Sequence, residues 1–564
     1  MRIKHFFGLA VIAAMTASCS SNNDLVNGGN GSGEVENGTA YASFKINLPT
    51  TSGTRADDPT PGTPSFDHGT AAEYEVKNGT ILIFDATTDK FVTSAELGTM
   101  NPWTDVKADG VTTAAIATVK LSDVSVTGNY NALVLLNNNT TDNATKKVTL
   151  PTTADTYATW SKDDLKANAT NYVSTDGIFM ANAPMYSATS EPTTLVKIKN
   201  VCASPEEAQA KAATVVYVER GLAKVTMKDF TAGGYPIADG TYAGGKVKIE
   251  NWQLDVTNKS TFPVHQTGTL KDSWAEIWNT TRFYDQTSAA FKRVYWGVDP
   301  NYNNSDYQTL ENCKNAFNMI TNDKVTGEAG NAHPQYCLEN TFDLNNMKQG
   351  QTTRVVFKAD FTPKDFTSEY KTFYKIGNNT TIWSQENLEK QIKTVAVTAM
   401  GITDDAEQAK YVVKLDATDN NISGKAGQHP VKKCNITYTG DAASSLVTDE
   451  IVNKINDKLG LSAETGISTY LNGEAYYIAR IKHFNELTPW EAGQAYDSNN
   501  AAFLGRYGVL RNNWYELSVN KVSGLGYPDV PEVKPTVPDD ENDQYINVSV
   551  KILDWAKRSQ TVDL

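Results

Sequence analysis

The clearest pattern near the start of the chain is a strict alternation of apolar and polar positions. In AYASFKINLP, which spans residues 40–49, the apolar residues Phe44, Ile46 and Leu48 alternate with polar neighbours. A period of two is typical of a β-strand with one buried face. A Gly-, Asn- and Ser-rich stretch precedes this strand, and the Pro- and Gly-rich loop TSGTRADDPTPGTPSF follows it. The pattern therefore predicts a flexible tether, a single strand and an exposed loop, in that order.

Short runs rich in Val, Ile, Thr and Tyr recur along the rest of the chain, among them TILIFDA, YNALVLLNNN, TVAVTAM and AYYIARIKHF. Twelve or more such runs, without long helices between them, predict an all-β chain of antiparallel β-sandwiches. Helical segments are few and short, such as SPEEAQAKAA (204–213) and TDEIVNKINDKLG (448–460). The first has no apolar stripe, so we expect a domain boundary close to residue 215.

The pattern changes twice near the C-terminus. The segment 527–543 is rich in prolines and acidic residues, and it predicts an extended spacer that does not pack. Beyond it, the segment 544–564 returns to a period of two and predicts one strand or two. The alternating apolar positions are Ile546, Val548, Val550 and Ile552, and Val562 and Leu564 keep the same parity.

A strand carried on a spacer has unpaired N–H and C=O groups and one apolar face, and both cost free energy in water. Two arrangements satisfy it. The strand folds back as the last strand of its own domain, or it adds to the sheet of a neighbouring subunit as a donor strand. The second arrangement needs a vacant groove.

Arg55 offers a way to open such a groove. It is the only Lys or Arg between Lys45 and Lys77, and it lies in a loop whose Gly and Pro residues favour the extended backbone that a protease binds. A cut between Arg55 and Ala56 would release the strand around Phe44.

The N-terminus MRIKHFFGLAVIAAMTASCSS has two basic residues, an apolar run and then Cys19, which predicts an export signal. The run of about 12 residues is too short for a bilayer span of roughly 20. A cysteine at this place is where bacterial lipoproteins are cut and acylated, so Cys19 is the expected lipidation site, although Thr16 stands where Leu is commoner. The alternative is an ordinary signal peptide with an incidental cysteine.

Composition narrows the function. A length of 564 residues accommodates two or more domains, and a mean hydropathy of −0.43 indicates a polar surface. With 51 Lys and Arg against 65 Asp and Glu, the net charge is −14, and no basic cluster is dense enough to bind phosphates. Nucleic acid is therefore not an expected partner.

The sequence gives little support for catalysis, a metal or another cofactor. Six histidines are scattered without an HExxH motif, and neither GxSxG nor a P-loop occurs. The best metal candidate is DPNYNNSD (299–306), where Asp299 begins a pattern like that of a calcium loop. Asn304 replaces the required Gly and Leu310 the bidentate Glu, so we interpret this stretch as a turn-rich loop.

Four further cysteines show no CxxC spacing, which disfavours zinc and thioredoxin-like chemistry. Cys313 and Cys337 are closest in sequence and either form a disulfide or remain buried thiols. The four residues are Cys202, Cys313, Cys337 and Cys434.

Several segments together resemble a known family, the major subunits (pilins) of type V fimbriae of Bacteroidales, in particular the short-fimbria branch. The resemblance covers most of the chain. Besides the lipoprotein signal, the Arg55 loop and the terminal strand, it rests on VERGLAKV (218–225), NWQLDVTNK (251–259), RVYWGVDPNYN (293–303), GEAYYIARIKH (473–483) and GRYGVLRNNWYELSVNKVSGLGYP (505–528).

The resemblance implies two transthyretin-like β-sandwich domains in tandem. The expected parts are a signal peptide (1–18), a propeptide with the removable strand (19–55), an N-terminal domain (56–215), a C-terminal domain (216–526), a spacer (527–543) and a donor segment (544–564). It also implies acylation of Cys19, for instance by palmitate, and cleavage between Arg55 and Ala56 by an arginine-specific surface protease. The implied donor residues are Ile546, Val548, Val550, Ile552, Trp555, Val562 and Leu564.

The function implied is that of a structural stalk subunit of a surface fimbria, which would support adhesion and biofilm formation. Its expected partners are copies of itself, anchor and accessory fimbrial subunits, the protease and surface receptors of unidentified kind. One alternative is a monomeric surface lipoprotein that binds glycans or host protein and keeps both terminal strands in place. Another is an accessory or tip subunit of the same fimbria.

Overall fold

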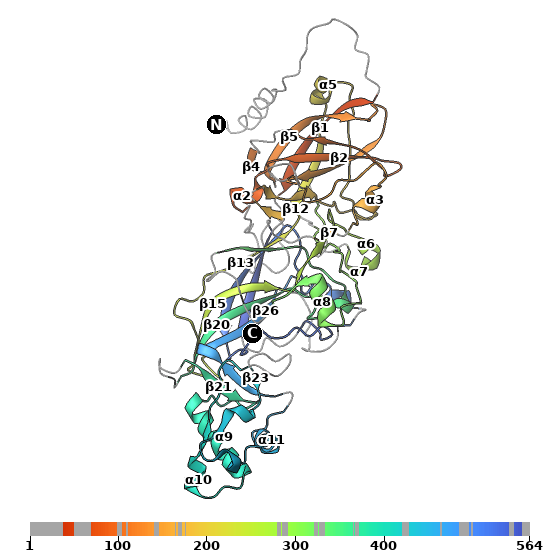
Figure 1. Cartoon of the computed structure of the whole chain (residues 1–564). Helices are drawn as coiled ribbons and strands as arrows, with labels where there is room; N and C mark the ends of the chain where they lie inside the picture. Colours follow the sequence, from red (N-terminus) through yellow and green to blue (C-terminus); the bar gives the residue numbers. More distant parts are fainter. Residues whose placement is uncertain are drawn as a thin grey trace, which may run out of the picture.

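The computed structural model describes most of the chain from residue 38 to residue 554. The described residues are 38–49, 69–98, 104–108, 111–139, 146–163, 165–166, 172–174, 176–278, 284, 292–320, 325, 333–364, 366, 371–419, 428–462, 465–483, 496–497, 500–540 and 546–554. Three parts follow one another along the molecule: an N-terminal domain, a C-terminal domain and an inserted module (Figure 1). Within the described residues, no helix combines the length and the apolar character that a membrane crossing requires.

The N-terminal domain is built on one sheet with the strand order β3-β2-β6-β10-β12-β1-β5-β4, and β11 pairs with β6. This sheet folds over so that the apolar residues of β2 and β6 pack against those of β1 and β5. The strands are β1 (Thr39–Pro49), β2 (Gly79–Asp85), β3 (Phe91–Glu96), β4 (Thr104–Ala108), β5 (Val111–Ser122), β6 (Tyr130–Leu136), β10 (Met180–Asn182), β11 (Val196–Lys197) and β12 (Thr214–Arg220).

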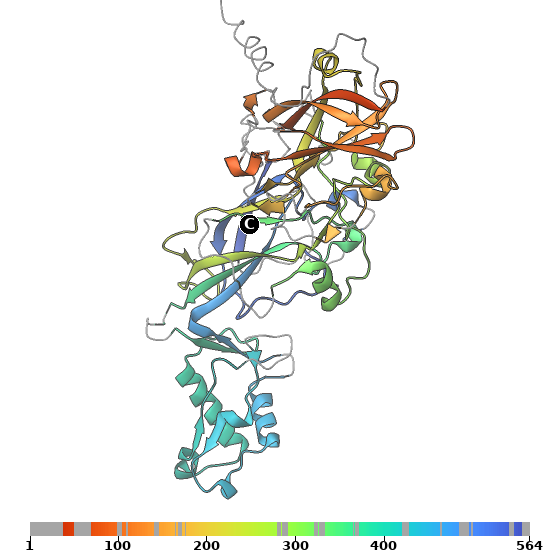
Figure 2. The same cartoon turned by 45° about the horizontal axis from the view of Figure 1, so that its top comes forward.

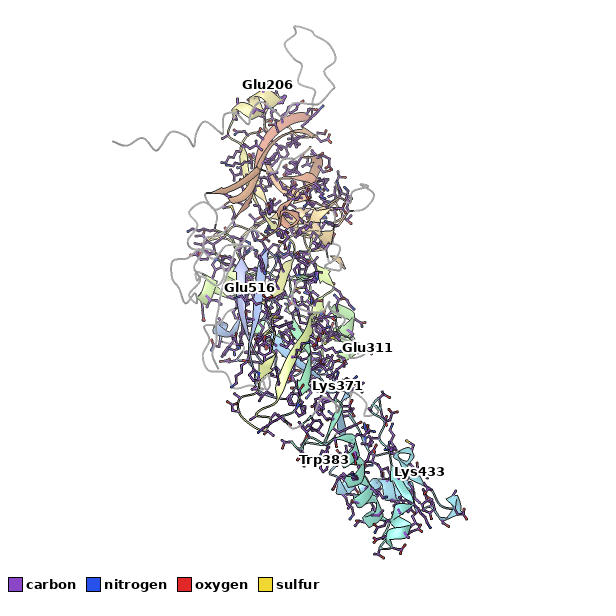
Figure 3. The ribbon with its side chains drawn as sticks, turned by 90° about the vertical axis from the view of Figure 1, so that its left-hand side faces the viewer. Glu206, Glu311, Lys371, Trp383, Lys433 and Glu516 are labelled. Atoms are coloured by element: carbon purple, nitrogen blue, oxygen red, sulfur yellow. The ribbon has the colours of Figure 1, made fainter. Side chains whose placement is uncertain are left out.

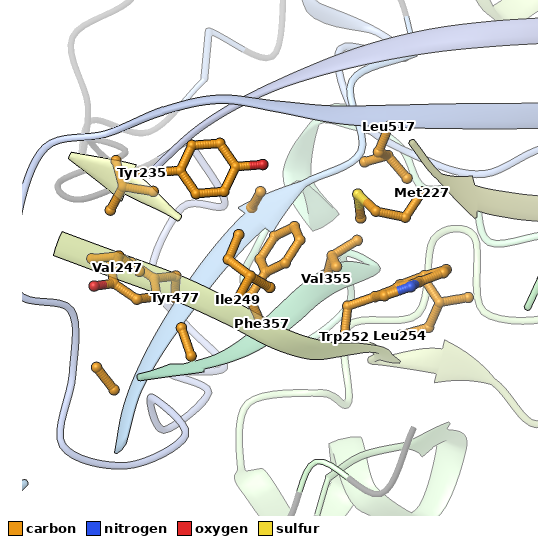
Figure 4. Close-up of a cluster of buried hydrophobic side chains, with 14 of the residues drawn as sticks. Met227, Tyr235, Val247, Ile249, Trp252, Leu254, Val355, Phe357, Tyr477 and Leu517 are labelled. Carbon is orange, nitrogen blue, oxygen red and sulfur yellow. The ribbon is translucent and has the colours of Figure 1, made fainter. Parts of the chain in front are cut away.

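The C-terminal domain is a sandwich of two four-stranded sheets, β19-β13-β27-β28 and β14-β15-β20-β26. Met227 and Leu517 of the first sheet pack near Val355 and Phe357 of the second, as Figure 4 shows. The strands are β13 (Ala223–Met227), β14 (Tyr235–Pro236), β15 (Lys246–Asp255), β19 (Gln335–Cys337), β20 (Arg354–Thr362), β26 (Glu474–Arg480), β27 (Asn513–Val522) and β28 (Ile546–Asp554).

The inserted module lies between β20 and β26, at the end of the molecule away from the N-terminal domain (Figures 1 and 2). It has a separate core in which helices cover small sheets. Its elements are β21 (Phe373–Ile376), β22 (Tyr411–Val413), β23 (Gln428–His429), β24 (Ile436–Tyr438), β25 (Ile467–Tyr470), α9 (Gln385–Ala399), α10 (Asp405–Ala409) and α11 (Asp449–Lys458).

Short elements complete the two domains and the module. They are β7 (Leu165–Lys166), β8 (Val173–Ser174), β9 (Gly177–Ile178), β16 (Thr257–Asn258), β17 (Ser260–Thr261), β18 (Phe317–Asn318), α2 (Ala71–Tyr74), α3 (Tyr157–Trp160), α5 (Pro205–Ala210), α6 (Leu270–Ser273), α7 (Ala275–Trp278), α8 (Leu310–Ala316), η2 (Leu344–Asn346), η3 (Lys433–Asn435), η4 (Ala442–Ser444), η5 (Leu471–Gly473) and η6 (Ala501–Phe503).

The expected all-β class is confirmed for the chain as a whole, but the inserted module differs from the expectation. The run TVAVTAM, interpreted as a strand, lies in α9 and its C-cap. Its β-branched residues favour a strand locally. Leu388, Ile392 and Ala396, four residues apart, instead form an apolar helix face that is fully buried.

The boundary expected close to residue 215 falls at the start of β12. This strand pairs with β1 and β10 of the N-terminal domain, and β13 begins the C-terminal domain three residues after β12 ends. The block VERGLAKV therefore carries the chain from one domain into the next.

Candidate strand-exchange site

Strand β1 lies inside the N-terminal sheet. It runs antiparallel to β5 along all 11 of its residues, and Phe44 to Asn47 pair in parallel with Thr214 to Tyr217 of β12. It therefore has two hydrogen-bonded neighbours. Without β1, both β5 and β12 would present an open edge to a common gap.

The predicted apolar face of β1 is completely buried. Phe44, Ile46 and Leu48 are each 0% exposed and belong to the main core of the N-terminal domain. Full burial of such side chains contributes roughly 1.5–3 kcal/mol each to stability. Removal of β1 would therefore leave an apolar groove as well as two open edges.

The second face of β1 is more covered than alternation alone predicts. Ser43 is buried because its hydroxyl donates a 2.8 Å hydrogen bond to the carbonyl of Ala208 in α5. The backbone of Tyr41 pairs with that of Cys202, which leads into this helix. The short helix α5 thus covers one end of the strand, a contact that the weak apolar pattern of residues 204–213 does not indicate.

Buried charges surround the passage from β12 to β13. Glu219, 1% exposed, lies 2.6 Å from Nε of Arg293 and 2.7 Å from Nδ1 of His265. Burial by itself raises the pKa of Glu219, but Arg293 and His265 outweigh it and lower the pKa to about 2. The carboxylate is therefore ionised at neutral pH and bound to both partners.

A second buried pair lies on the other side of this passage. Oε1 of Glu73 is 2.7 Å from Nζ of Lys224 and accepts a 2.7 Å hydrogen bond from the hydroxyl of Tyr336. Burial opposes ionisation of Glu73, yet Lys224 brings its pKa below the usual value. Because Glu73 comes from the N-terminal domain and Lys224 and Tyr336 from the C-terminal domain, this pair joins the two.

The C-terminal strand β28 pairs antiparallel with β27 of its own domain and lies at the edge of that sheet. The backbone register sets the alternating positions of β28 opposite three buried residues of β27 and the partly buried Val519. The pairs are Ile546 with Val522, Val548 with Val519, Val550 with Leu517 and Ile552 with Tyr515. In this single chain the strand thus takes the folded-back arrangement, the first of the two left open by the sequence.

The remaining predicted site residues fall outside the described residues. These are Cys19, Arg55, Ala56, Trp555, Val562 and Leu564. Of the predicted site, the structure therefore places the removable strand and the first part of the donor segment.

The expectation that residues 527–543 form an unpacked spacer is wrong for residues 527–540, because these residues pack against the C-terminal domain. Val533 and Asp539 are 6% and 0% exposed. The sequence predicts a segment in solvent because a polar, proline-rich stretch has few apolar groups to bury. Its backbone instead finds hydrogen-bond partners on the domain, among them Gln349, whose N–H donates to the carbonyl of Val537.

The four later cysteines are free thiols, so the disulfide between Cys313 and Cys337 is not formed. Cys202, Cys313 and Cys337 are buried and Cys434 is exposed. Burial raises the pKa of Cys337 to about 12, so this residue acts as a small apolar group.

The calcium-like loop is held by its own hydrogen bonds. Asp299 accepts 2.6 Å hydrogen bonds from the N–H groups of Asn301 and Thr341, and burial raises its pKa to about 7. Asn301 is bound in turn to Asn258 and Tyr307. Over the part of the chain that the structure describes, no three His, Cys, Asp or Glu side chains are grouped as metal ligands.

Comparison with known proteins gives one informative match. Residues 468–561 match the family of major fimbrial subunit protein type IV, fimbrillin, C-terminal. The matched range includes β26, β27 and β28, and over it the resemblance to fimbrial subunits is confirmed. No curated protein matches the chain.

Two solved structures from Parabacteroides distasonis are distantly similar. One is a protein provisionally assigned to cell adhesion, with 10% identity, a TM-score of 0.37 and coverage of 93% of this chain and 99% of that chain. The other is a fimbrial assembly protein, with 11% identity, a TM-score of 0.23 and coverage of 57% and 95%. At TM-scores below 0.5, neither likeness bears on the fold or the function of this chain.

Proposed function

We propose that this chain, with its fimbrillin C-terminal segment, is the stalk subunit of a surface fimbria and polymerises by protease-activated donor-strand exchange. Its precursor is exported as an outer-membrane lipoprotein acylated at Cys19. An arginine-specific surface protease cuts between Arg55 and Ala56 and frees β1. The C-terminal strand of another copy then takes the place of β1.

The observation that carries this proposal is the unequal bonding of the two terminal strands. β28 is an edge strand with 9 residues in register with one neighbour, β27. A strand in the place of β1 has two neighbours, β5 and β12, and covers a core. Transfer of a donor strand from the edge to this groove therefore gains a second ladder of hydrogen bonds.

The two strands also have matching patterns. Both β1 and β28 carry apolar residues at every second position, so one can occupy the groove of the other without a change of face. This contact joins two different surfaces, the groove of one copy and the C-terminal strand of the next. Because it does not close on itself, it generates a fibre.

Copies of the chain are thus its main partners, with anchor and accessory fimbrial subunits at the ends. The protein acts as a structural element rather than an enzyme, and the resulting cell-surface fibre supports adhesion and biofilm formation.

One observation favours a second candidate. β28 pairs with β27 of its own chain, as expected of a monomeric surface lipoprotein that keeps both terminal strands in place. A polymerising subunit must break this pairing, whereas a monomeric binder keeps it.

N-terminal sequencing and intact-mass measurement of the protein recovered from the cell surface distinguish the two. We expect a chain that begins at Ala56 and migrates as a ladder of high-mass species under mild denaturation. An Arg55→Gln variant should keep its N-terminal strand and remain monomeric. Removal of residues 544–564 should leave a cut, folded protein that does not polymerise. A native chain that begins at an acylated Cys19 and is monomeric contradicts the proposal and supports the second candidate.

A further inference from the structure

The segment between β27 and β28 is attached to the C-terminal domain along most of its length. We call residues 527–540 the strap. At its start, Tyr527 exchanges two backbone hydrogen bonds of 2.8 and 2.9 Å with Tyr476 of β26. Farther along, Nη2 of Arg354 donates a 2.7 Å hydrogen bond to the carbonyl of Pro531. Arg354 is fixed in turn by Asp255, 2.8 Å away.

The middle of the strap packs closely on the domain. Val533 lies in a small core with Cys313 and Phe317. A Cβ atom added to Gly350 would be 2.9 Å from Cα of Pro535 and 2.8 Å from Sγ of Cys313. Gly350 therefore allows an approach of the strap that a larger residue would prevent.

Two adjacent carboxylates hold the end of the strap. Asp539 is 0% exposed and accepts hydrogen bonds from the hydroxyls of Thr352, at 2.7 Å, and Tyr496, at 2.6 Å. Its N–H also donates to the carbonyl of Met347.

Asp540 makes the second attachment. It is 6% exposed, accepts a 2.9 Å hydrogen bond from the hydroxyl of Tyr507 and lies 2.7 Å from Nε of Arg506. Thr352 and Tyr496 bind the first of these successive carboxylates, and Arg506 and Tyr507 bind the second. The chain therefore leaves the domain at a fixed point.

We propose that Asp539 and Asp540 form a clasp that fixes the point at which the donor strand departs, so that strand exchange moves only the chain after Asp540. This inference rests on the proposed function. It makes the two aspartates positioning residues for assembly, and the strap remains on its own domain in the fibre.

The clasp also limits the distance between neighbouring copies. Five residues separate Asp540 from Ile546. An extended chain covers at most about 3.6 Å per residue, so Ile546, six residue steps from Asp540, lies within roughly 22 Å of the clasp wherever the strand goes. The groove left by β1 in the next copy must therefore lie close to the part of the C-terminal domain that holds Asp539 and Asp540.

Two disulfide staples test the proposal in a Cys434→Ser background. The strap staple joins Lys348→Cys to Pro538→Cys, which are bridge partners. The strand staple joins Ser518→Cys to Ser549→Cys, which are opposite each other on β27 and β28. Intact mass establishes that each bond has formed. Polymer yield after cleavage at Arg55 is then compared in oxidised and reduced samples of each variant.

We expect the strap-stapled protein to polymerise within about twofold of its reduced form, and the strand-stapled protein to lose at least tenfold until it is reduced. A tenfold, reversible loss with the strap staple would overturn the clasp proposal while the proposed function stands. Full polymerisation with the strand staple would instead contradict donor-strand exchange.

A second comparison tests the two aspartates directly. In the double variant Asp539→Ala and Asp540→Ala, which lacks the hydrogen bonds to Thr352, Tyr496 and Tyr507, we expect amide exchange across residues 527–540 to rise at least tenfold while exchange in β20 stays unchanged. The control is Glu532→Gln, an exposed residue of the strap. Equal exchange in the double variant and the control would show that the clasp does not hold the strap.

Discussion

Single side chains decide how firmly β1 is held and where the strap ends. Phe44 and Lys45 are neighbours in the same strand, yet the first is 0% exposed and the second lies on the outer face. Asp539 is buried among polar groups that the sequence does not place near it. At this scale, burial distinguishes Phe44 from the adjacent Lys45, and Asp539 from Glu532, an exposed residue of the same strap.

Phe44→Ala should destabilise the N-terminal domain of the uncut precursor by about 3–5 kcal/mol, because it leaves a cavity in the core. Lys45→Ala is the matched control and should change stability by less than about 0.5 kcal/mol. Urea unfolding of the precursor measures both. Equal effects of the two changes would contradict the burial of the apolar face.

The attachment of the strap should weaken as the pH rises. Burial raises the pKa of Asp539 to about 6, from 3.8. Arg480, Tyr496 and Asp540 face this carboxyl. The pKa of Asp539 is higher in the folded protein than in the unfolded chain, so the protonated carboxyl favours the folded state. This stabilisation is fully present below pH 3.8 and is lost as the pH rises through 6. Between pH 5 and 7.5 the loss is on the order of 1 kcal/mol.

Amide exchange of residues 527–540, corrected for its intrinsic pH dependence, measures this effect. Asp539→Asn should reduce the pH dependence, although Asp540, whose pKa burial also raises, and the groups around it, Arg506 and Lys482, remain. A slope that is the same in both proteins would assign the pH dependence to other groups.

At the scale of elements, the continuous segment from β12 to β13 joins the two domains. Glu219 on β12 binds Arg293 and His265 of the C-terminal domain, and Lys224 on β13 binds Glu73 of the N-terminal domain. Pairs of opposite charge therefore cross the junction in both directions. A buried ion pair is not in itself strong stabilisation, but loss of one partner is costly.

Glu219→Ala should destabilise the protein by about 3–5 kcal/mol, because Arg293 then remains buried without its carboxylate. Glu206→Ala is the control, since Glu206 is an exposed acidic residue of α5 at the far end of the N-terminal domain (Figure 3). Thermal unfolding gives the difference. A loss below 1 kcal/mol for Glu219→Ala would mean that the junction does not depend on this carboxylate.

At the scale of the whole molecule, the inserted module has a separate core and lies away from the N-terminal domain. Lys433 and Glu206 mark its position and the opposite end of the molecule in Figure 3. β20 and β26, which flank the insertion, pair directly in the sheet of the C-terminal domain. Stability in the module should therefore be separable from assembly.

Ile392→Ala should loosen the module while polymer formation stays unchanged. Ile392 is 0% exposed in the core under α9, whereas the neighbouring Gln391 is exposed and serves as the control. Amide exchange should increase in residues 373–470 and remain constant in β27. Equal loosening of β27 would show that the module and the C-terminal domain unfold together.

The sequence by itself determined the local structure. Alternation defined β1 and β28, Val- and Tyr-rich runs defined most strands, and residues 448–460 indicated α11, because a period of two or of 3.6 is a property of neighbouring residues. The motifs near the C-terminus also led to the fimbrial resemblance, which the match over residues 468–561 confirms.

Only the tertiary structure decided which strands pair and what is buried. It placed β1 between β5 and β12, covered Ser43 with α5, and bound the strap through Asp539. Ser43 and Ala208 are 165 positions apart in the sequence, and Thr352 and Asp539 are 187 apart. No local pattern encodes these contacts, because the free energy of burying a polar group depends on partners that only the folded chain brings together.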